Sequence, residues 1–221
     1  MPEHDGALAH QFHDYGQQRR AAELAMWVFL VTEFMFFGGL FLAYLVYRYR
    51  YPAEFALGSQ TMDVVLGTIN TLVLLTSSLT MALAVHAATV SNRRMLILLL
   101  WGTIFLGTVF LGIKAYEYHH KYVKHHVPFA GQEFHAEPEH RLGLATFYNL
   151  YFLMTGVHAL HMIIGIGLML VLVVAAYRGG LTGPRSIVVH NSGLYWHFVD
   201  LVWVYLFPFF YLVAARGGGH G

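Results

Sequence analysis

Residues 143–177, GLATFYNLYFLMTGVHALHMIIGIGLMLVLVVAAY, decide how the rest of the chain is interpreted. The segment contains no Asp, Glu, Lys or Arg, yet it carries His158 and His161 near its middle. A helix of this length, at about 1.5 Å per residue, exceeds a hydrocarbon core of about 30 Å and is expected to project past one membrane face. Polar side chains at such depth normally point into a bundle. The two histidines therefore predict neighbouring helices.

Composition indicates a membrane protein before any motif is considered. The 221 residues are 57% hydrophobic and 11% charged, whereas soluble domains carry about 25% charged residues. A net charge of +1 gives no basic face for nucleic acid. The absence of cysteine excludes disulfides and thiolate metal sites. One compact membrane unit is the expected organisation.

Five apolar segments predict an all-α polytopic membrane protein, a bundle of five transmembrane helices. The membrane domain is expected over residues 22–216, with spans at about 22–47, 64–88, 95–118, 143–177 and 192–215. A polar N-terminal tail, 1–21, precedes it and a Gly-rich tail, 217–221, follows it. Pro52 is expected to end the first helix and Pro208 to kink the last one.

The orientation follows from the basic loops. Lys and Arg residues outside the spans divide equally between the two sides, but the loops at 91–94 and 178–191 are short, basic and free of acids. Short loops carry the positive-inside signal. We therefore expect a cytoplasmic N-terminus and a C-terminus on the outer side.

Glu33 is the one acid in the interior of the first span, since Glu23 stands at its edge. An ionised carboxylate in hydrocarbon costs at least about 2.5 kcal/mol on insertion scales, so such a group is usually neutralised or paired. We expect a structural carboxyl that joins the first span to the fourth through His158 or His161. Proton conduction and contact with a lipid head group or ligand are the alternatives.

The histidines of the last two spans allow two interpretations. His158 and His161 share one helical face, and a haem or metal site completed by His197 or His86 is the functional alternative. Buried imidazoles bonded to neighbouring helices require fewer assumptions and are the preferred interpretation. His197 and Asp200, three residues apart, are likewise expected to form a structural pair in which the carboxylate fixes the histidine tautomer. No metal ligand or catalytic residue is predicted.

Other polar and small residues are assigned to helix ends and helix packing. Lys114 and Glu117 are expected to form an ion pair near a membrane boundary, with the lysine snorkelling outward. Small and hydroxyl residues let helices approach closely in lipid. The candidates for packing are Asn70, Ser77, Thr103, Gly107, Thr108 and Gly112.

The connection between the third and fourth spans is rich in histidine. Its spacing matches no compact zinc pattern, so adventitious metal binding and docking of a partner remain alternatives for it. Phosphate-loop, dinucleotide-binding and nucleophile-elbow patterns are absent, which leaves soluble-type catalysis without support. The histidines concerned are His119, His120, His125, His126, His135 and His140.

Two motifs resemble subunit III of the haem-copper terminal oxidases, the cytochrome c and quinol oxidases of respiratory chains. They are Thr155-Gly156-Val157-His158-Ala159-Leu160-His161-Met162-Ile163-Ile164-Gly165 and Tyr195-Trp196-His197-Phe198-Val199-Asp200-Leu201-Val202-Trp203. Supporting matches are Thr32-Glu33-Phe34-Met35-Phe36-Phe37, Asn70-Thr71, Thr76-Ser77-Ser78-Leu79-Thr80 and Glu117-Tyr118. They cover all five spans in the family's order.

The resemblance implies a non-catalytic subunit of the five-span form found in many bacterial oxidases, in the cytoplasmic membrane. It implies direct contact with oxidase subunit I, association with subunit II, and support of proton uptake and oxygen access during electron transport from cytochrome c to oxygen. Haem and copper are expected in the partner subunits and none in this chain. Bound phospholipid is expected between helices.

Three alternatives stay open. The chain could serve a quinol oxidase, or a nitric oxide reductase as an accessory subunit, since such proteins would share these motifs. A small membrane transporter is a more distant alternative, although transporters commonly show internal repeats and broken helices. The sequence also departs from the family at Lys114, where glutamine is often found.

Overall fold

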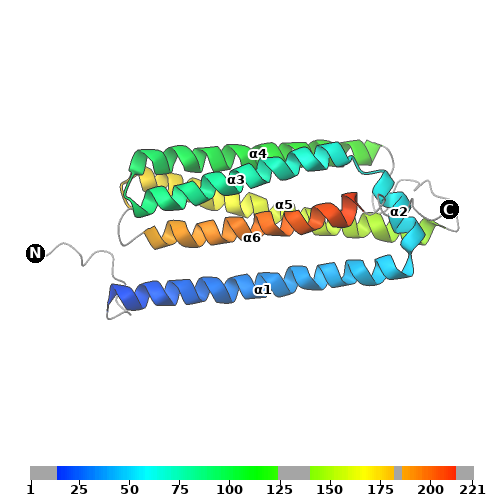
Figure 1. The fold of residues 1–221 in the computed structure, drawn as a ribbon, viewed down its shortest axis with the longest axis horizontal. Helices are drawn as coiled ribbons and strands as arrows, with labels where there is room; N and C mark the ends of the chain where they lie inside the picture. Colours follow the sequence, from blue (N-terminus) through cyan, green and yellow to red (C-terminus); the bar gives the residue numbers. More distant parts are fainter. Residues whose placement is uncertain (1–13, 124–139, 182–185, 213–221) are drawn as a thin grey trace, which may run out of the picture.

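The structure, a computed structural model, describes residues 14–123, 140–181 and 186–212, and these residues form helices joined by short turns (Figure 1). The part of the chain that it describes contains no strand. The helices are α1 (Tyr15–Arg50), α2 (Pro52–Gln60), α3 (Val64–Thr89), α4 (Arg93–Val123), α5 (Arg141–Tyr177) and α6 (Ser186–Tyr211).

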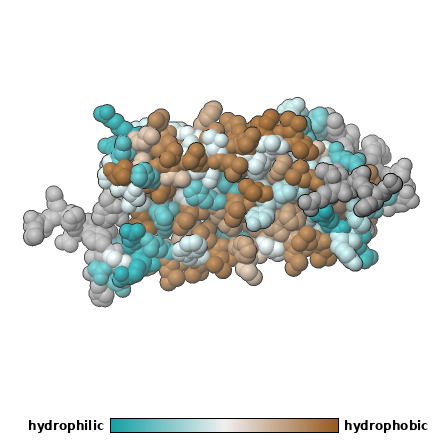
Figure 2. Space-filling model, in the orientation of Figure 1, coloured by the Kyte–Doolittle hydropathy of each residue, from teal (hydrophilic) through white to brown (hydrophobic). Residues whose placement is uncertain are grey.

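All of these helices except α2 are long and apolar enough to cross a membrane. They lie side by side along one axis, and Figure 2 shows an apolar band between two ends where hydrophilic side chains gather. The predicted all-α bundle of five transmembrane helices is therefore confirmed. The chain is a multi-pass membrane protein.

Helix α1 begins earlier than the sequence analysis predicted. Asp14 caps it, because its carboxylate accepts a hydrogen bond from the Gln17 backbone N–H at 2.7 Å. Arg19 and Glu23 then form an ion pair at i,i+4. Residues 15–21 are thus helical and do not belong to a separate polar tail. Residues 1–13 and the predicted tail at 217–221 lie outside the described residues.

Helix α2 was not predicted. Pro52 does follow the end of α1, but it also occupies the first turn of α2, where its missing N–H costs nothing and its fixed φ suits a helix. A Cβ on Gly58 would come within 2.4 Å of the Phe147 ring. Thr61 Oγ1 adds a hydrogen bond to Tyr148 at 2.9 Å. These contacts dock α2 on the first turns of α5.

The long helices pack around α6. Helix α3 packs most extensively on α4 and α6, α5 contacts α4 and α6, and α1 contacts α6 and α5. The α3–α4 turn is tight, since Ser91 adopts a φ of 58°. The other helices differ from the expected spans by a few residues at their ends. Helix α4 runs from Arg93 to Val123, and α6 begins at Ser186. Helix α6 continues through Pro208, and residues 213–215 lie outside the described residues.

The predicted packing residues divide into two groups. Asn70, Ser77 and Thr103 are buried, and a Cβ on Gly107 would come within 2.8 Å of the Trp196 ring. The second pair on α4, Thr108 and Gly112, takes no part in packing between the described helices of this chain. Their side of α4 faces away from the bundle. The Thr108 hydroxyl donates to its own helix at Ile104 O, and a Cβ on Gly112 would meet no atom within 4 Å.

This difference predicts opposite effects for one substitution at two positions of the same helix. Gly107→Ala should lower the free energy of unfolding by about 1–3 kcal/mol, because the added methyl group forces Trp196 to move. Gly112→Ala is the matched control and should leave stability unchanged or raise it by up to about 1 kcal/mol. Unfolding in mixed micelles measures both changes. Equal effects at the two positions would contradict the packing described here.

Candidate functional site

Glu33 of α1 and His161 of α5 form a polar contact in the middle of the membrane band. Glu33 Oε2 lies 3.1 Å from His161 Nε2. The Phe37 ring packs edge-on against the imidazole, with centroids 5.2 Å apart. Of the two histidines that the sequence offered as partners of Glu33, the structure brings His161 to it.

Donor and acceptor roles constrain the protonation of this pair. His161 Nδ1 lies 2.8 Å from Val157 O, a carbonyl that only accepts, so Nδ1 carries a proton. The Nε2–Glu33 contact then needs one further proton, on the imidazole or on the carboxyl. In either case the two groups together carry no net charge. A neutral pair is far less costly in hydrocarbon than an isolated carboxylate.

His158 is placed differently from His161. It is buried, and neither ring nitrogen has a hydrogen-bond partner in the part of the chain that the structure describes. Its ring packs against Phe110 and Trp203, with centroids 5.5 Å and 5.4 Å away. The expected hydrogen bond from His158 to a neighbouring helix is therefore absent among the described residues, because aromatic rings surround the imidazole.

The expected His197–Asp200 pair is also absent among the described hydrogen bonds. His197 Nδ1 instead lies 2.7 Å from Ser78 Oγ on α3. Asp200 is buried, its carboxylate oxygens form no hydrogen bond by distance and angle within the described residues, and Ser78 is a polar group that interacts with it. His197 and Asp200 are three residues apart and therefore share one side of α6. Ser78 of α3 lies beside both side chains and takes the place of the expected direct contact. The five predicted network residues therefore do not form one network. Glu33 contacts His161, His197 and Asp200 lie beside Ser78, and His158 has no hydrogen bond among the described residues.

Lys114 and Glu117 form the predicted ion pair, with 2.9 Å between Nζ and Oε2. The ammonium also donates to the hydroxyls of Tyr151 and Tyr211, each at 3.0 Å. Tyr211 in turn donates to the Glu117 carboxylate, 2.7 Å from Oε1. All three ammonium protons thus have acceptors, and the cluster joins α4 to α5 and α6.

The prediction that Lys114 snorkels outward is wrong. Its side chain is 4% exposed and that of Glu117 is 7% exposed. The ammonium also lies over aromatic rings, 4.9 Å from the Trp203 ring and 5.0 Å from the Tyr151 ring. Cation–π attraction strengthens when the cation is desolvated. Lys114 therefore turns inward, because the interior supplies both its counter-ion and its acceptors.

Further interhelical bonds were not predicted from the sequence. Trp196 donates to Ser77 Oγ at 3.1 Å, and Trp203 donates to Thr71 Oγ1 at 3.1 Å. The two tryptophans lie seven residues apart on α6. Their acceptors lie six residues apart on α3. These nearly equal spacings were the signal in the sequence that could have predicted the two bonds. Hydrophobicity alone assigns tryptophan to apolar packing or to the membrane interface.

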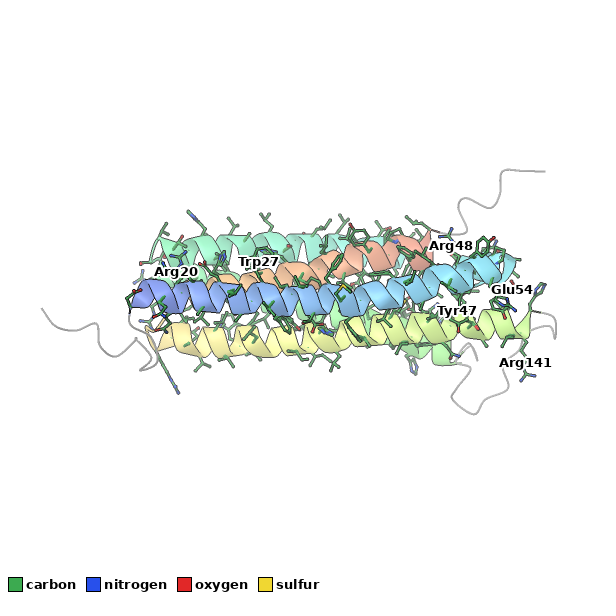
Figure 3. All side chains as sticks on the ribbon, turned by 90° about the horizontal axis from the view of Figure 1, so that it is seen from below. Arg20, Trp27, Tyr47, Arg48, Glu54 and Arg141 are labelled. Atoms are coloured by element: carbon green, nitrogen blue, oxygen red, sulfur yellow. The ribbon has the colours of Figure 1, made fainter. Side chains whose placement is uncertain are left out.

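Helix α1 is attached to the other helices near both of its ends as well as at Glu33. Asn191 of α6 donates from Nδ2 to Ala22 O at 3.1 Å. Near the opposite end, the Tyr44 hydroxyl donates to Phe209 O. Figure 3 shows α1 lying along α5 and α6, with Arg20 toward one end and Arg48 toward the other. These bonds fix a helix that otherwise exposes most of its apolar side chains.

The histidine-rich connection is described only at its margins. His119 and His120 belong to the last turns of α4, and His140 Nδ1 lies 3.2 Å from Glu54 Oε1 of α2. Glu54 is labelled in Figure 3 beside the start of α5. His125, His126 and His135 lie outside the described residues. No cluster of three potential metal ligands occurs among residues 14–123, 140–181 and 186–212.

The Lys114–Glu117 geometry predicts strong energetic coupling. Lys114→Met leaves a buried carboxylate without its counter-ion and should lower the free energy of unfolding by about 3–5 kcal/mol. The double variant Lys114→Met/Glu117→Gln should lose less than the sum of the two single variants, because no isolated charge remains. Unfolding in mixed micelles provides the double-mutant cycle.

Thr108→Val serves as the control for this cycle, since Thr108 faces outward on the same helix. It should change stability by no more than about 0.5 kcal/mol. Strictly additive losses from Lys114→Met and Glu117→Gln would contradict a coupled buried pair.

Comparison with known proteins places the chain among respiratory oxidase subunits. Residues 9–215 match the family model described as "Cytochrome c oxidase subunit III". A relative named cytochrome c oxidase subunit 3, from Alkalihalophilus pseudofirmus, is 34% identical over 88% of this chain and 87% of its own length. A quinol oxidase subunit 3 from Bacillus spizizenii is 31% identical over 88% of both chains.

A third relative is a fused protein. The haem-copper oxidase subunit I+III of Aeropyrum pernix is 32% identical over 86% of this chain, which corresponds to 22% of the relative. The family match extends across all five transmembrane helices and includes each of the polar clusters described above. The chain therefore belongs to the subunit III family of the haem-copper oxidases and forms part of an oxidoreductase complex.

Proposed function

We propose that this subunit III is a non-catalytic scaffold that supports the catalytic subunit of its oxidase. The observation that carries the proposal is that Lys114, Glu117, Glu33 and His161, ionisable groups embedded in the membrane band, link helices of this chain. Lys114 directs all three ammonium protons to groups of this chain, and Glu33 meets His161 across two helices. Groups used in this way are not available as ligands for a redox centre.

Subunit I is the proposed direct partner, and subunit II and other subunits complete the assembly. The fused Aeropyrum pernix relative, whose printed name joins subunits I and III, supports a direct contact. Haem and copper would be carried by these partner subunits. The proposed contribution of this chain is assembly, sustained proton uptake and access of oxygen to the catalytic subunit.

Phospholipid is a second proposed ligand. An apolar groove of about 380 Å³ lies between α1, α5 and α6 at the end where α1 begins. Met26 and Phe29 line it from α1, and Ile164 and Leu168 line it from α5. An acyl chain from the adjoining leaflet matches both the apolar lining and the position of this groove.

The proposed location is the bacterial cytoplasmic membrane, with the N-terminus in the cytoplasm and the C-terminus in the periplasm. The α3–α4 turn, with Arg93 and Arg94, lies at the end of the bundle where α1 starts (Figure 1). Arg93 also donates to Tyr177 O at the end of α5. The relatives include both cytochrome c and quinol oxidases, and cytochrome c is the donor that we propose. A transporter or a reductase accessory role has no comparable support.

Two substitutions of Glu33 separate scaffolding from proton conduction. Glu33→Gln keeps an amide that can donate to His161 Nε2, so the oxidase should assemble and pump protons normally. Glu33→Leu removes the contact and should weaken the attachment of the subunit by about 1–3 kcal/mol, with single-turnover electron transfer intact. The measurements are retention of the subunit in the purified complex and proton release in a single turnover.

Thr32→Ala is the matched control at the same depth, since the Thr32 hydroxyl donates only to Phe29 O of its own helix. It should leave both measurements unchanged. A Glu33→Gln oxidase that assembles normally but fails to pump from its first turnover would assign proton conduction to Glu33 and reject the scaffold role for it.

A further inference from the structure

The α3–α6 face presents a half-buried histidine at the middle of the membrane band. His197 lies near the midpoint of α6, and Ser78 lies near the midpoint of α3. The Ser78 hydroxyl engages His197 Nδ1 at 2.7 Å. His197 Nε2 has no hydrogen-bond partner among the described residues and is not among their buried unpaired atoms. It therefore lies at the molecular surface.

Three exposed threonines on the outward faces of the helices do not share this property. Thr32, Thr76 and Thr108 are exposed, but each hydroxyl donates to a carbonyl of its own helix. An imidazole is too long and too rigid to satisfy Nε2 in the same way. The His197 ring thus presents a polar nitrogen to a zone where acyl chains offer no hydrogen bond.

The surroundings of His197 form an apolar surface suited to a helix. Leu201 and Val204 follow His197 at i+4 and i+7 on α6, and both are exposed. Leu75, on the neighbouring stretch of α3, is exposed as well. Figure 2 shows hydrophilic side chains within the apolar band near the middle of this face, where α3 and α6 lie in front. Apolar side chains at i+4 and i+7 from one polar group are typical of a surface that packs against another membrane helix.

From this geometry we infer that the α3–α6 face centred on His197 receives a transmembrane helix of the catalytic subunit, whose polar group hydrogen-bonds to His197 Nε2. The inference rests on the proposed association with subunit I and specifies which face makes it. Lipid is the poorer occupant, because head groups lie at the membrane boundaries and the acyl chains at this depth have no donor or acceptor.

Photo-crosslinking in the assembled oxidase tests the face directly. A photo-reactive benzoyl-phenylalanine at position 201 should form an adduct with subunit I in native membranes. The same residue at position 98, where Leu98 is exposed on α4, is the control and should form none. Adducts with subunit I from position 98 and not from 201, or adducts from 201 only with a second copy of this chain or with lipid, would overturn the inference.

A steric variant tests the same face without disturbing the interior. Leu201→Trp adds bulk to a side chain that is 50% exposed, and it should reduce retention of the subunit in the purified complex about threefold to tenfold. Leu98→Trp should leave retention unchanged, and His197→Leu should resemble Leu201→Trp. Full retention of Leu201→Trp rejects the face. If the tagged wild-type chain retains no haem-containing subunit, the proposed function itself fails, independently of these variants.

Discussion

Hydrocarbon offers no hydrogen bond, and this constraint explains how the polar clusters in the interior of the bundle are arranged. An ammonium, three carboxyls and several histidines lie at membrane depth in a chain whose remaining span residues are mostly apolar. The Lys114 cluster meets the constraint most completely, because every proton of the ammonium has an acceptor on this chain. Since these acceptors belong to three helices, satisfying the charge also fixes the arrangement of α4, α5 and α6. The same logic applies on a smaller scale to Glu33 with His161.

Much of the architecture could be predicted from the sequence because membrane spans depend on composition over long windows. The five apolar segments and their order required only the distribution of charged residues. The depth of Glu33 and of the two histidines of α5 could be read by counting from the polar boundaries. Depth limited the partners of Glu33 to His158 and His161, and the structure selects His161. Helix ends were less predictable, because the start of α1 depends on a single capping side chain, Asp14.

The features that were missed depend on rotation about helix axes and on partners distant in sequence. Lys114 turns inward because Tyr151 and Tyr211 supply acceptors from other helices, which no local pattern in α4 reveals. Thr108 and Gly112 repeat the spacing of Thr103 and Gly107, but five residues correspond to more than one helical turn and place them on another side of α4. His197 and Asp200 share a side of α6, yet Ser78 from α3 replaces the expected direct contact.

The attachments of α1 at Ala22, Glu33 and Tyr44 recur every eleven residues, which is about three full helical turns. All three consequently lie along one stripe of the helix at intervals of about 16 Å. Between them, aromatic rings of α1 pack on rings of α6, as Phe37 does on Phe198 and Phe41 on Phe209. Displacing α1 by a single turn, or rotating it about its axis, would separate all three bonds at once. The three bonds therefore fix both the axial position and the rotation of α1 relative to α5 and α6.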